Sequence, residues 1–173
     1  MAKQSEIDYI DNIGPDGAYH AQNKPYSDPR CGNYFLDLGA IFLLLPPPPA
    51  RLLDLGIGSG WTSIIFAQRG YQVTGQDIAP AMIELAQLNK KKAGVNNVDF
   101  LVSDYESMTI PELFDCAVFY DSLHHSVNEQ AALTAVYRSL KPGGICITVE
   151  PGKDHHLSPG TQYAIETYGV TEK

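Results

Sequence analysis

Three glycines stand at alternate positions directly after an aliphatic run in the segment LLDLGIGSGWTS, residues 52–63. A turn from a buried strand into a helix needs residues without a Cβ atom wherever the backbone approaches a ligand closely or becomes left-handed. The left-handed conformation costs any other residue about 1 to 2 kcal/mol. We therefore expect Gly56, Gly58 and Gly60 to form a strand-to-helix turn whose backbone lies against a ligand.

The spacing of these glycines separates two kinds of nucleotide cofactor. The G-x-G-x-x-G fingerprint of dinucleotide sites would place its third glycine at position 61, where this chain has Trp61. The observed spacing, G-x-G-x-G, favours a cofactor without a pyrophosphate over a nicotinamide dinucleotide. Taken alone, it leaves a tight turn without any ligand open as an alternative.

Short apolar runs alternate with helical periods from Arg51 onward. The expected strands are residues 51–55, 71–77, 98–102, 114–120 and 145–149. Helices are expected at 61–69, from Pro80 to the stop at Gly94, and around residues 133–140. This alternation predicts an α/β fold with a doubly wound, mostly parallel sheet, in which ligands bind at the carboxyl ends of the strands.

The segment before the expected sheet has a different character. The first thirty residues are polar and weakly periodic, so we expect an arm there rather than core, with Tyr26 in a lid over the site. A helix is expected from about Cys31 to Leu45, because the four prolines at 46–49 lack the N–H groups that would continue it. We therefore divide the chain into residues 1–50, an arm and helix, and residues 51–173, the core.

Carboxylates follow the glycine turn at the next two strand ends. Asp77 closes the second expected strand, and Asp104 follows the third. A carboxylate at the second strand end can accept both hydroxyls of a ribose, and one beyond the third can accept from an exocyclic amine. Capping of a turn or of a helix start is the structural alternative for each acid.

Together these features resemble the class I S-adenosylmethionine-dependent methyltransferases, particularly their small-molecule methyltransferase domains. The matching segments are DLGIGSG at 54–60, Asp77, Asp104, FDCAVFYDSLHH at 114–125 and LKPGG at 140–144. The resemblance implies a Rossmann-like methyltransferase fold and an enzyme that transfers a methyl group from S-adenosyl-L-methionine to a small-molecule acceptor. A cofactor-binding module without transferase activity and, as a weaker option, a nicotinamide-dependent oxidoreductase are the alternatives.

The resemblance also implies roles for individual residues. The implied cofactor-binding residues are Asp54, Gly56, Gly58, Gly60, Asp77, Ile78, Asp104, Tyr105 and Tyr120. Asp54 would help to hold the methionine amino group, and Tyr120 would line the methionine side. Asp77 would bind the ribose hydroxyls with Ile78 packed on the adenine, and Asp104 would meet the adenine amine.

Two adjacent histidines, His124 and His125, are the candidates for catalysis. A neutral imidazole can take a proton from a hydroxyl or an ammonium near neutral pH. Neighbouring histidines usually face different ways, so His124 is expected to line the pocket, and a purely structural role stays open for either. A second pair, His155 and His156, is expected at the same rim. Because neither pair has the spacing of metal ligands, we expect no metal site.

Family members carry two further strands after the fifth, and residues 150–173 contain no such pair. Either the chain is a fragment, or its sheet ends at the fifth strand. An unpaired strand edge invites pairing with another strand. We therefore expect a homodimer, a missing segment or a second polypeptide at this edge.

Charge and cysteine content restrict partners and location. The net charge of −8 and the pI near 4.9 argue against nucleic acid and anionic membranes, which bind clustered Lys and Arg. The chain shows no signal-peptide pattern at its start. Cys31, Cys116 and Cys146 form no CxxC pair, and the last two lie in apolar runs, so we expect buried, reduced thiols in a cytoplasmic protein.

Overall fold

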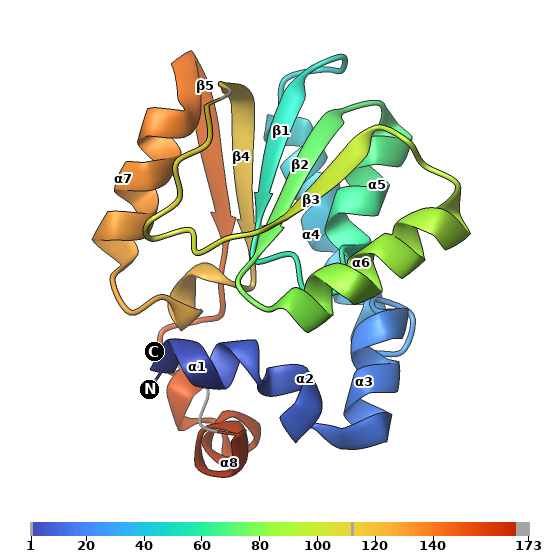
Figure 1. Cartoon of the computed structure of the whole chain (residues 1–173), viewed down its shortest axis with the longest axis vertical. Helices are drawn as coiled ribbons and strands as arrows, with labels where there is room; N and C mark the ends of the chain where they lie inside the picture. Colours follow the sequence, from blue (N-terminus) through green and yellow to red (C-terminus); the bar gives the residue numbers. More distant parts are fainter. Residues whose placement is uncertain (1, 112, 169–173) are drawn as a thin grey trace.

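The computed structural model describes residues 2–111 and 113–168 of the chain. Its centre is one sheet of five strands in the order β3-β2-β1-β4-β5, and every neighbouring pair is parallel. The strands are β1 (Arg51–Leu55), β2 (Gln72–Asp77), β3 (Val98–Val102), β4 (Phe114–Tyr120) and β5 (Leu140–Val149). All five point their carboxyl ends toward the same edge, which confirms the predicted doubly wound α/β fold (Figure 1).

Successive residues of β1 face opposite sides of the sheet and define its two hydrophobic layers. Leu52 belongs to a cluster with side chains of α4 (Cys31–Leu44) and α5 (Trp61–Arg69). Leu53 belongs to a second cluster with side chains of α7 (Glu129–Ser139). Because β1 and β4 are buried on both faces, both read as nearly continuous apolar runs.

The ends of the two helices beside β2 lie where the sequence predicted them. Helix α5 begins after Gly60 and ends at Gly70, and both glycines are left-handed. Helix α6 (Pro80–Ala93) carries proline in its first turn and ends at the left-handed Gly94. Proline fits there because the first helical N–H groups have no intrahelical partner, whereas glycine supplies the left-handed cap.

The first part of the chain is more regular than its sequence predicted. Instead of an irregular arm, it forms α1 (Ala2–Ile7), α2 (Tyr9–Asn12) and α3 (Gly14–Asn23). The first two helices are too short to display a clear helical period, which explains why the pattern did not reveal them. Helices α1, α2 and α8 (Pro159–Tyr168) lie beyond the carboxyl ends of the strands (Figure 1).

Strand β5 differs from the prediction in two ways. It begins at Leu140 rather than Ile145, and the pairing register shifts where the KPGG residues are inserted opposite β4. The prediction that Cys146 is buried is wrong, because it lies on β5, one of the two edge strands of the sheet, and its side chain is exposed. Cys116, on the central β4, is buried as expected.

Two further points concern the C-terminal end of the core and the length of the helices. The proposed C-terminal limit of the core falls on residues 169–173, which lie outside the described residues. Over the described part of the chain, the helices are all too short or too polar to cross a bilayer.

Candidate functional site

The glycine turn after β1 is left-handed at all three glycines, with φ angles of 67° at Gly56, 53° at Gly58 and 76° at Gly60. A Cβ atom on Gly56 would lie 2.5 Å from Cβ of Ser122, and one on Gly60 would lie 2.8 Å from Cβ of Ala86. A Cβ atom on Gly58 would have no heavy atom within 4 Å. The outer two glycines are therefore required by packing within the protein, whereas the middle one faces open space that a ligand can fill.

Asp77 links the end of β2 to this turn. Its Oδ2 accepts a hydrogen bond from the Gly58 amide at 2.8 Å, and its Oδ1 accepts one from the Ala79 amide at 2.9 Å. Burial raises the pKa of Asp77 to about 6, although the two amide donors oppose that shift. The structure thus brings the predicted ribose acceptor against the predicted cofactor loop. Ile78, the residue expected under the adenine, follows directly and is half-buried.

Asp54 lies on the other side of the turn, inside the protein. Its Oδ2 accepts hydrogen bonds from Thr62 at 2.7 Å and from Ser63 at 2.6 Å, both in the first turn of α5. Burial raises the pKa of Asp54 to about 6, and the two hydroxyl donors oppose the shift. These contacts hold Asp54 to the side chains at the start of α5, and the role in holding a methionine amino group stays a prediction.

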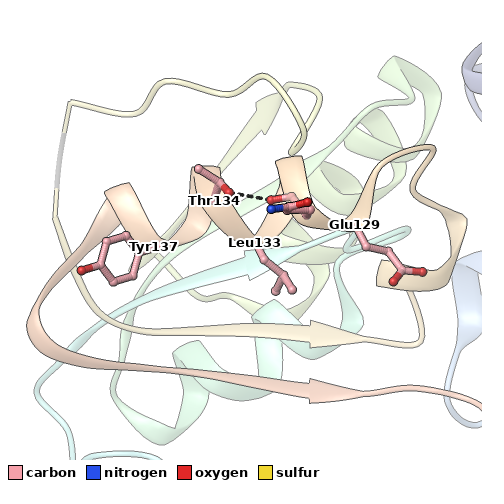
Figure 2. A pocket seen from close by; sticks show the side chains of 5 residues that line it. Glu129, Leu133, Thr134 and Tyr137 are labelled. Carbon is pink, nitrogen blue, oxygen red and sulfur yellow. Dashed lines mark hydrogen bonds between the residues drawn. The ribbon is translucent and has the colours of Figure 1, made fainter.

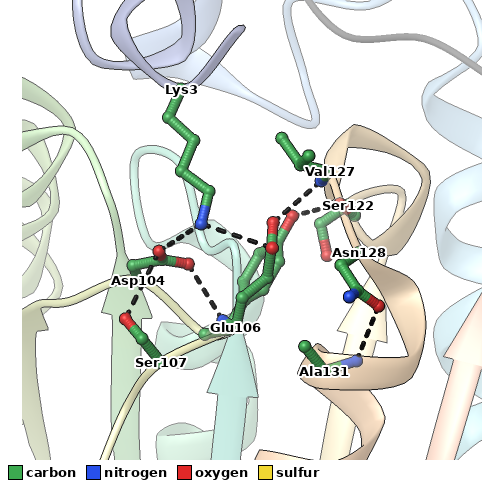
Figure 3. A network of polar contacts seen from close by, with 9 residues as sticks. Lys3, Asp104, Glu106, Ser107, Ser122, Val127, Asn128 and Ala131 are labelled. Atoms are coloured by element: carbon green, nitrogen blue, oxygen red, sulfur yellow. Dashed lines mark hydrogen bonds and ion pairs between the residues drawn. The ribbon is translucent and has the colours of Figure 1, made fainter.

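Asp104 meets a partner that the sequence did not suggest. Its Oδ2 lies 2.5 Å from Nζ of Lys3 on α1, and the same ammonium lies 3.3 Å from Oε2 of Glu106 (Figure 3). Oδ1 of Asp104 accepts from the Glu106 amide at 2.9 Å. Helix α1 also carries Glu6, whose charge adds to the upward shift of the Asp77 pKa. Helix α1 therefore contacts Asp104 directly and brings the charge of Glu6 near Asp77.

Sequence reasoning missed Lys3 and Glu6 as site residues. They belong to a polar segment that carries no motif, and only the folded chain places them over the strand ends. Their exposure is intermediate for Lys3, at 39% of the side chain, and lower for Glu6, at 18%. No sequence signal was available that could have identified either residue.

His124 is held by a carboxylate at the end of β5. Its Nδ1 lies 2.6 Å from Oε2 of Glu150, and Oε1 of Glu150 accepts the Leu123 amide at 3.0 Å. The imidazole is 8% exposed. A proton on Nδ1, shared with Glu150, places the lone pair on Nε2, which is the arrangement a general base requires. Sequence reasoning did not include Glu150 among the site residues, although a carboxylate directly after the fifth strand was the available signal.

His125 has a carboxylate partner of its own, but its ring lies against that of His124 instead of facing a different way, as was expected. Its Nδ1 lies 3.7 Å from Oε1 of Glu6 on α1. The His124 ring lies 4.1 Å from the His125 ring and 5.6 Å from the His155 ring, measured between centroids, so one histidine of the second pair reaches the same rim. Within residues 2–111 and 113–168, no three His, Cys, Asp or Glu side chains are grouped to hold a metal ion.

Two predicted tyrosines lie at the strand ends with their hydroxyls engaged. The Tyr120 hydroxyl donates to Oδ2 of Asp37 at 2.8 Å, and its ring meets the Trp61 ring edge-on at 5.4 Å. The Tyr105 hydroxyl donates to the Ser122 carbonyl at 3.0 Å, and burial raises its pKa. Both rings are therefore fixed in place, Tyr120 beside α5 and Tyr105 beside Gly56, whose missing Cβ would lie 3.7 Å from it.

Tyr26, the residue expected in a lid, is 77% exposed. Its ring pairs with the Phe35 ring of α4 at a centroid distance of 5.8 Å. The contact places Tyr26 beside α4. The helix that contacts Asp104 is α1, and a role for Tyr26 in closing the site stays a prediction.

Two hollows lie on the surface, one on α7 and one beside the glycine turn. One of about 440 Å³ is lined only by side chains of α7, including Leu133 and Tyr137, and is a surface depression (Figure 2). The other, of about 620 Å³, lies between the 19–27 segment and helices α5 and α6. It borders the glycine turn through Asn89, whose Nδ2 donates to the Ser59 carbonyl at 3.1 Å.

Most of the sheet, together with its glycine turn, matches the model of one known protein family. The family model described as "Methyltransferase domain" matches residues 53–148, which is more than half of the chain. A ubiquinone biosynthesis O-methyltransferase of Xanthomonas axonopodis pv. citri (strain 306) is 32% identical over 151 residues, covering 82% of this chain and 58% of that protein. The chain spans about half the length of the curated relatives it matches.

The similar solved structures include a methyltransferase and a protein that is named for a different reaction. CalS10, an amino pentose methyltransferase from Micromonospora echinaspora solved with bound S-adenosylmethionine, has a TM-score of 0.60 at 25% identity, over 79% of this chain and 56% of its own. The [4+2]-cyclase SpnF has a TM-score of 0.62 at 30% identity, over 70% of this chain and 46% of its own. The fold is thus shared with a methyltransferase and with a protein named for another reaction.

Proposed function

We propose that this chain, which belongs to the class I S-adenosylmethionine-dependent methyltransferases, transfers a methyl group from S-adenosylmethionine to a small-molecule acceptor. The observation that carries the proposal is the open side of Gly58, which lies next to the carboxylate of Asp77 at the carboxyl edge of the sheet. A nucleoside without phosphates needs close backbone contact and a hydroxyl acceptor, and this pair offers both.

The residues at the strand ends fit the chemistry of the cofactor. Asp77 would accept the ribose hydroxyls, Ile78 would pack on the adenine, and Asp104 would accept from the adenine amine. The space above Gly58 would take the part of the cofactor that crosses the turn. The hydroxyl of Ser59, between the second and third glycines, is buried without a hydrogen-bond partner among the described residues and supports a polar ligand here.

When bound, the cofactor supplies an electrophilic methyl group on a sulfonium. The protein's own contribution to the reaction is alignment of the acceptor, which can be worth about 7 to 11 kcal/mol, and removal of a proton where the acceptor carries one. His124 would accept that proton at Nε2, while Glu150 holds the imidazole through Nδ1 and balances the positive charge that forms. His125, turned toward Glu6, would contribute less.

Calorimetry with S-adenosylhomocysteine, the demethylated product, tests cofactor binding. We expect saturable binding with one site per chain, and no binding would overturn the proposal. Transfer is tested by incubating the chain with S-adenosylmethionine that carries a radiolabelled methyl group and with a panel of phenols, amines and sugars. Label in an extractable small molecule is the expected result.

A second function is favoured by one comparison, the likeness to the cyclase SpnF. In this alternative the chain holds the cofactor without transferring its methyl group. Intact binding of S-adenosylhomocysteine, combined with no labelled product across the whole panel, would favour it. A nicotinamide-dependent reaction is disfavoured by Trp61 at the third fingerprint position, and competition between NAD and S-adenosylhomocysteine tests it directly.

Location and assembly complete the proposal. A cytoplasmic location is supported by three free cysteines in the described residues, because reducing compartments keep thiols unpaired. A homodimer or a further segment at β5 is supported by the edge position of that strand and the exposure of Ile145 and Cys146. Light scattering tests the assembly, and a stable monomer with no tendency to associate would contradict the homodimer.

A further inference from the structure

Helix α1 lies beyond the carboxyl ends of the strands, where it contacts Asp104, one of the two acids proposed to hold the adenosine (Figure 1). Lys3 reaches down from this helix and contacts both Asp104, at 2.5 Å, and Glu106, at 3.3 Å (Figure 3). A second contact joins Glu6 of the same helix to His125 at 3.7 Å. The helix is thus attached at both sides of the predicted adenosine position, to the loop after β3 and to the turn after β4.

The two carboxylates that Lys3 contacts are fixed in place, because backbone amides donate hydrogen bonds to them. Asp104 accepts the Glu106 amide at 2.9 Å, and Glu106 accepts the Val127 amide at 2.8 Å. Side-chain exposure is 23% for Asp104 and 10% for Glu106. The two carboxylates therefore stay in place when Lys3 leaves.

Helix α1 itself is weakly attached to the rest of the protein. Helix α1 has six residues, and within the described part of the chain none of them belongs to a hydrophobic core cluster. The next apolar anchors, Tyr9 and Ile10 of α2, pack against the small cluster around Met82. Ile7, its one large apolar side chain, is only half-buried, so this short helix depends on its polar contacts, and such segments open at low free-energy cost.

We infer that α1 is a gate over the cofactor site, held closed by the ion pairs of Lys3 with Asp104 and Glu106. The inference rests on the proposed function, because it assumes that the nucleoside lies between Asp77 and Asp104. Entry and departure of the cofactor then require the Lys3 pairs to separate. The gate controls the exchange rate of the cofactor, and the two oxygens of Asp104 have enough acceptor sites for the adenine amine while Lys3 stays paired.

Stopped-flow fluorescence measures this exchange. Trp61 is the only tryptophan of the chain and directly follows Gly60, so its emission reports on the turn under the ligand. We expect the Lys3→Gln variant to release S-adenosylhomocysteine about fivefold faster than the wild-type chain, as for loss of a partly exposed ion pair. Raising the salt concentration from about 0.05 M to about 0.5 M should speed release from the wild type but not from Lys3→Gln.

Two further variants separate the gate from a general charge effect. Lys3→Arg keeps the positive charge and should restore slow, salt-sensitive release. Lys91→Gln removes the same charge from the exposed end of α6, outside α1, and should release the ligand at the wild-type rate. Should Lys91→Gln accelerate release as much as Lys3→Gln, the gate is overturned.

The outcomes also distinguish the gate from the function on which it rests. Binding of S-adenosylhomocysteine with equal release rates in the wild type and Lys3→Gln would overturn the gate and leave the proposed function standing. Failure of the wild-type chain to bind S-adenosylhomocysteine, measured by calorimetry, would overturn both.

Discussion

The carboxylate of Asp77 accepts the amide hydrogen of Gly58 at 2.8 Å, which joins the end of β2 to the middle of the glycine turn after β1. Gly58 is also the one glycine of the turn whose missing side chain faces empty space. A ligand that lies on Gly58 must therefore lie within reach of Asp77. This relationship makes the turn and the acid one site rather than two.

Substitution of Gly58 by alanine tests the open side of the turn. Gly58→Ala should abolish binding of S-adenosylhomocysteine, because the added methyl group enters the space proposed for the cofactor. Gly94→Ala is the matched control, since Gly94 is also left-handed, with φ of 68°, and also faces no atom within 4 Å. Both variants should lose about 1 to 2 kcal/mol of unfolding free energy in urea titrations. Equal cofactor affinity in the two variants would contradict a ligand at Gly58.

Substitution of Gly60 tests packing rather than binding. The new Cβ of Gly60→Ala would lie 2.8 Å from Cβ of Ala86, so this variant should be about 2 to 4 kcal/mol less stable than the wild type. Ala86→Gly removes the atom that is struck, and the double variant should be more stable than the two single losses predict. A double-mutant cycle measured by urea unfolding gives this coupling, and strict additivity would exclude the clash.

The pH dependence of cofactor binding should report Asp77. Its pKa is raised to about 6, so the carboxylate becomes protonated as the pH falls through that value, and a protonated carboxyl accepts ribose hydroxyls less well. Affinity for S-adenosylhomocysteine should therefore be constant above the pKa and fall about tenfold per pH unit below it. Asp77→Asn should bind weakly with no such slope. An unchanged slope in Asp77→Asn would assign the titration to another group.

The pair of His124 and Glu150 should affect turnover and not cofactor affinity. For an acceptor that loses a proton, His124→Ala should lower kcat by about 10² to 10⁴, as for loss of a general base. Glu150→Gln keeps the shape but removes the charge behind the imidazole, so it should lower kcat less and shift the pH profile of kcat. His125→Ala serves as the neighbouring control. Full turnover by His124→Ala would leave His124 with a structural role only.

The sheet could be predicted from the sequence because each of its signals is local. Proline at the start of α6, glycine after α5 and α6, and apolar runs of strand length fix these elements within a few residues of the chain. The exposure of Cys146 could not be predicted in this way. Burial of a strand depends on what lies beside it, and β5 is an edge strand.

The site was predictable only where its residues follow strands. The carboxyl ends of parallel strands meet at one edge, so Asp77 and the glycine turn could be placed together in advance. The contact of Lys3 with Asp104 joins residues 101 positions apart and has no local pattern. Glu150 beside His124 is an intermediate case, because a carboxylate directly after the fifth strand is visible in the sequence but its hydrogen bond is not.

The most direct test of the proposed cofactor site is a crystal structure of the chain with S-adenosylhomocysteine bound. The account predicts ribose hydroxyls within hydrogen-bond distance of Asp77, backbone of Gly58 against the ligand, and the adenine lying along Ile78 toward Asp104. A nucleoside bound elsewhere, or one that leaves Asp77 without a contact, would contradict it.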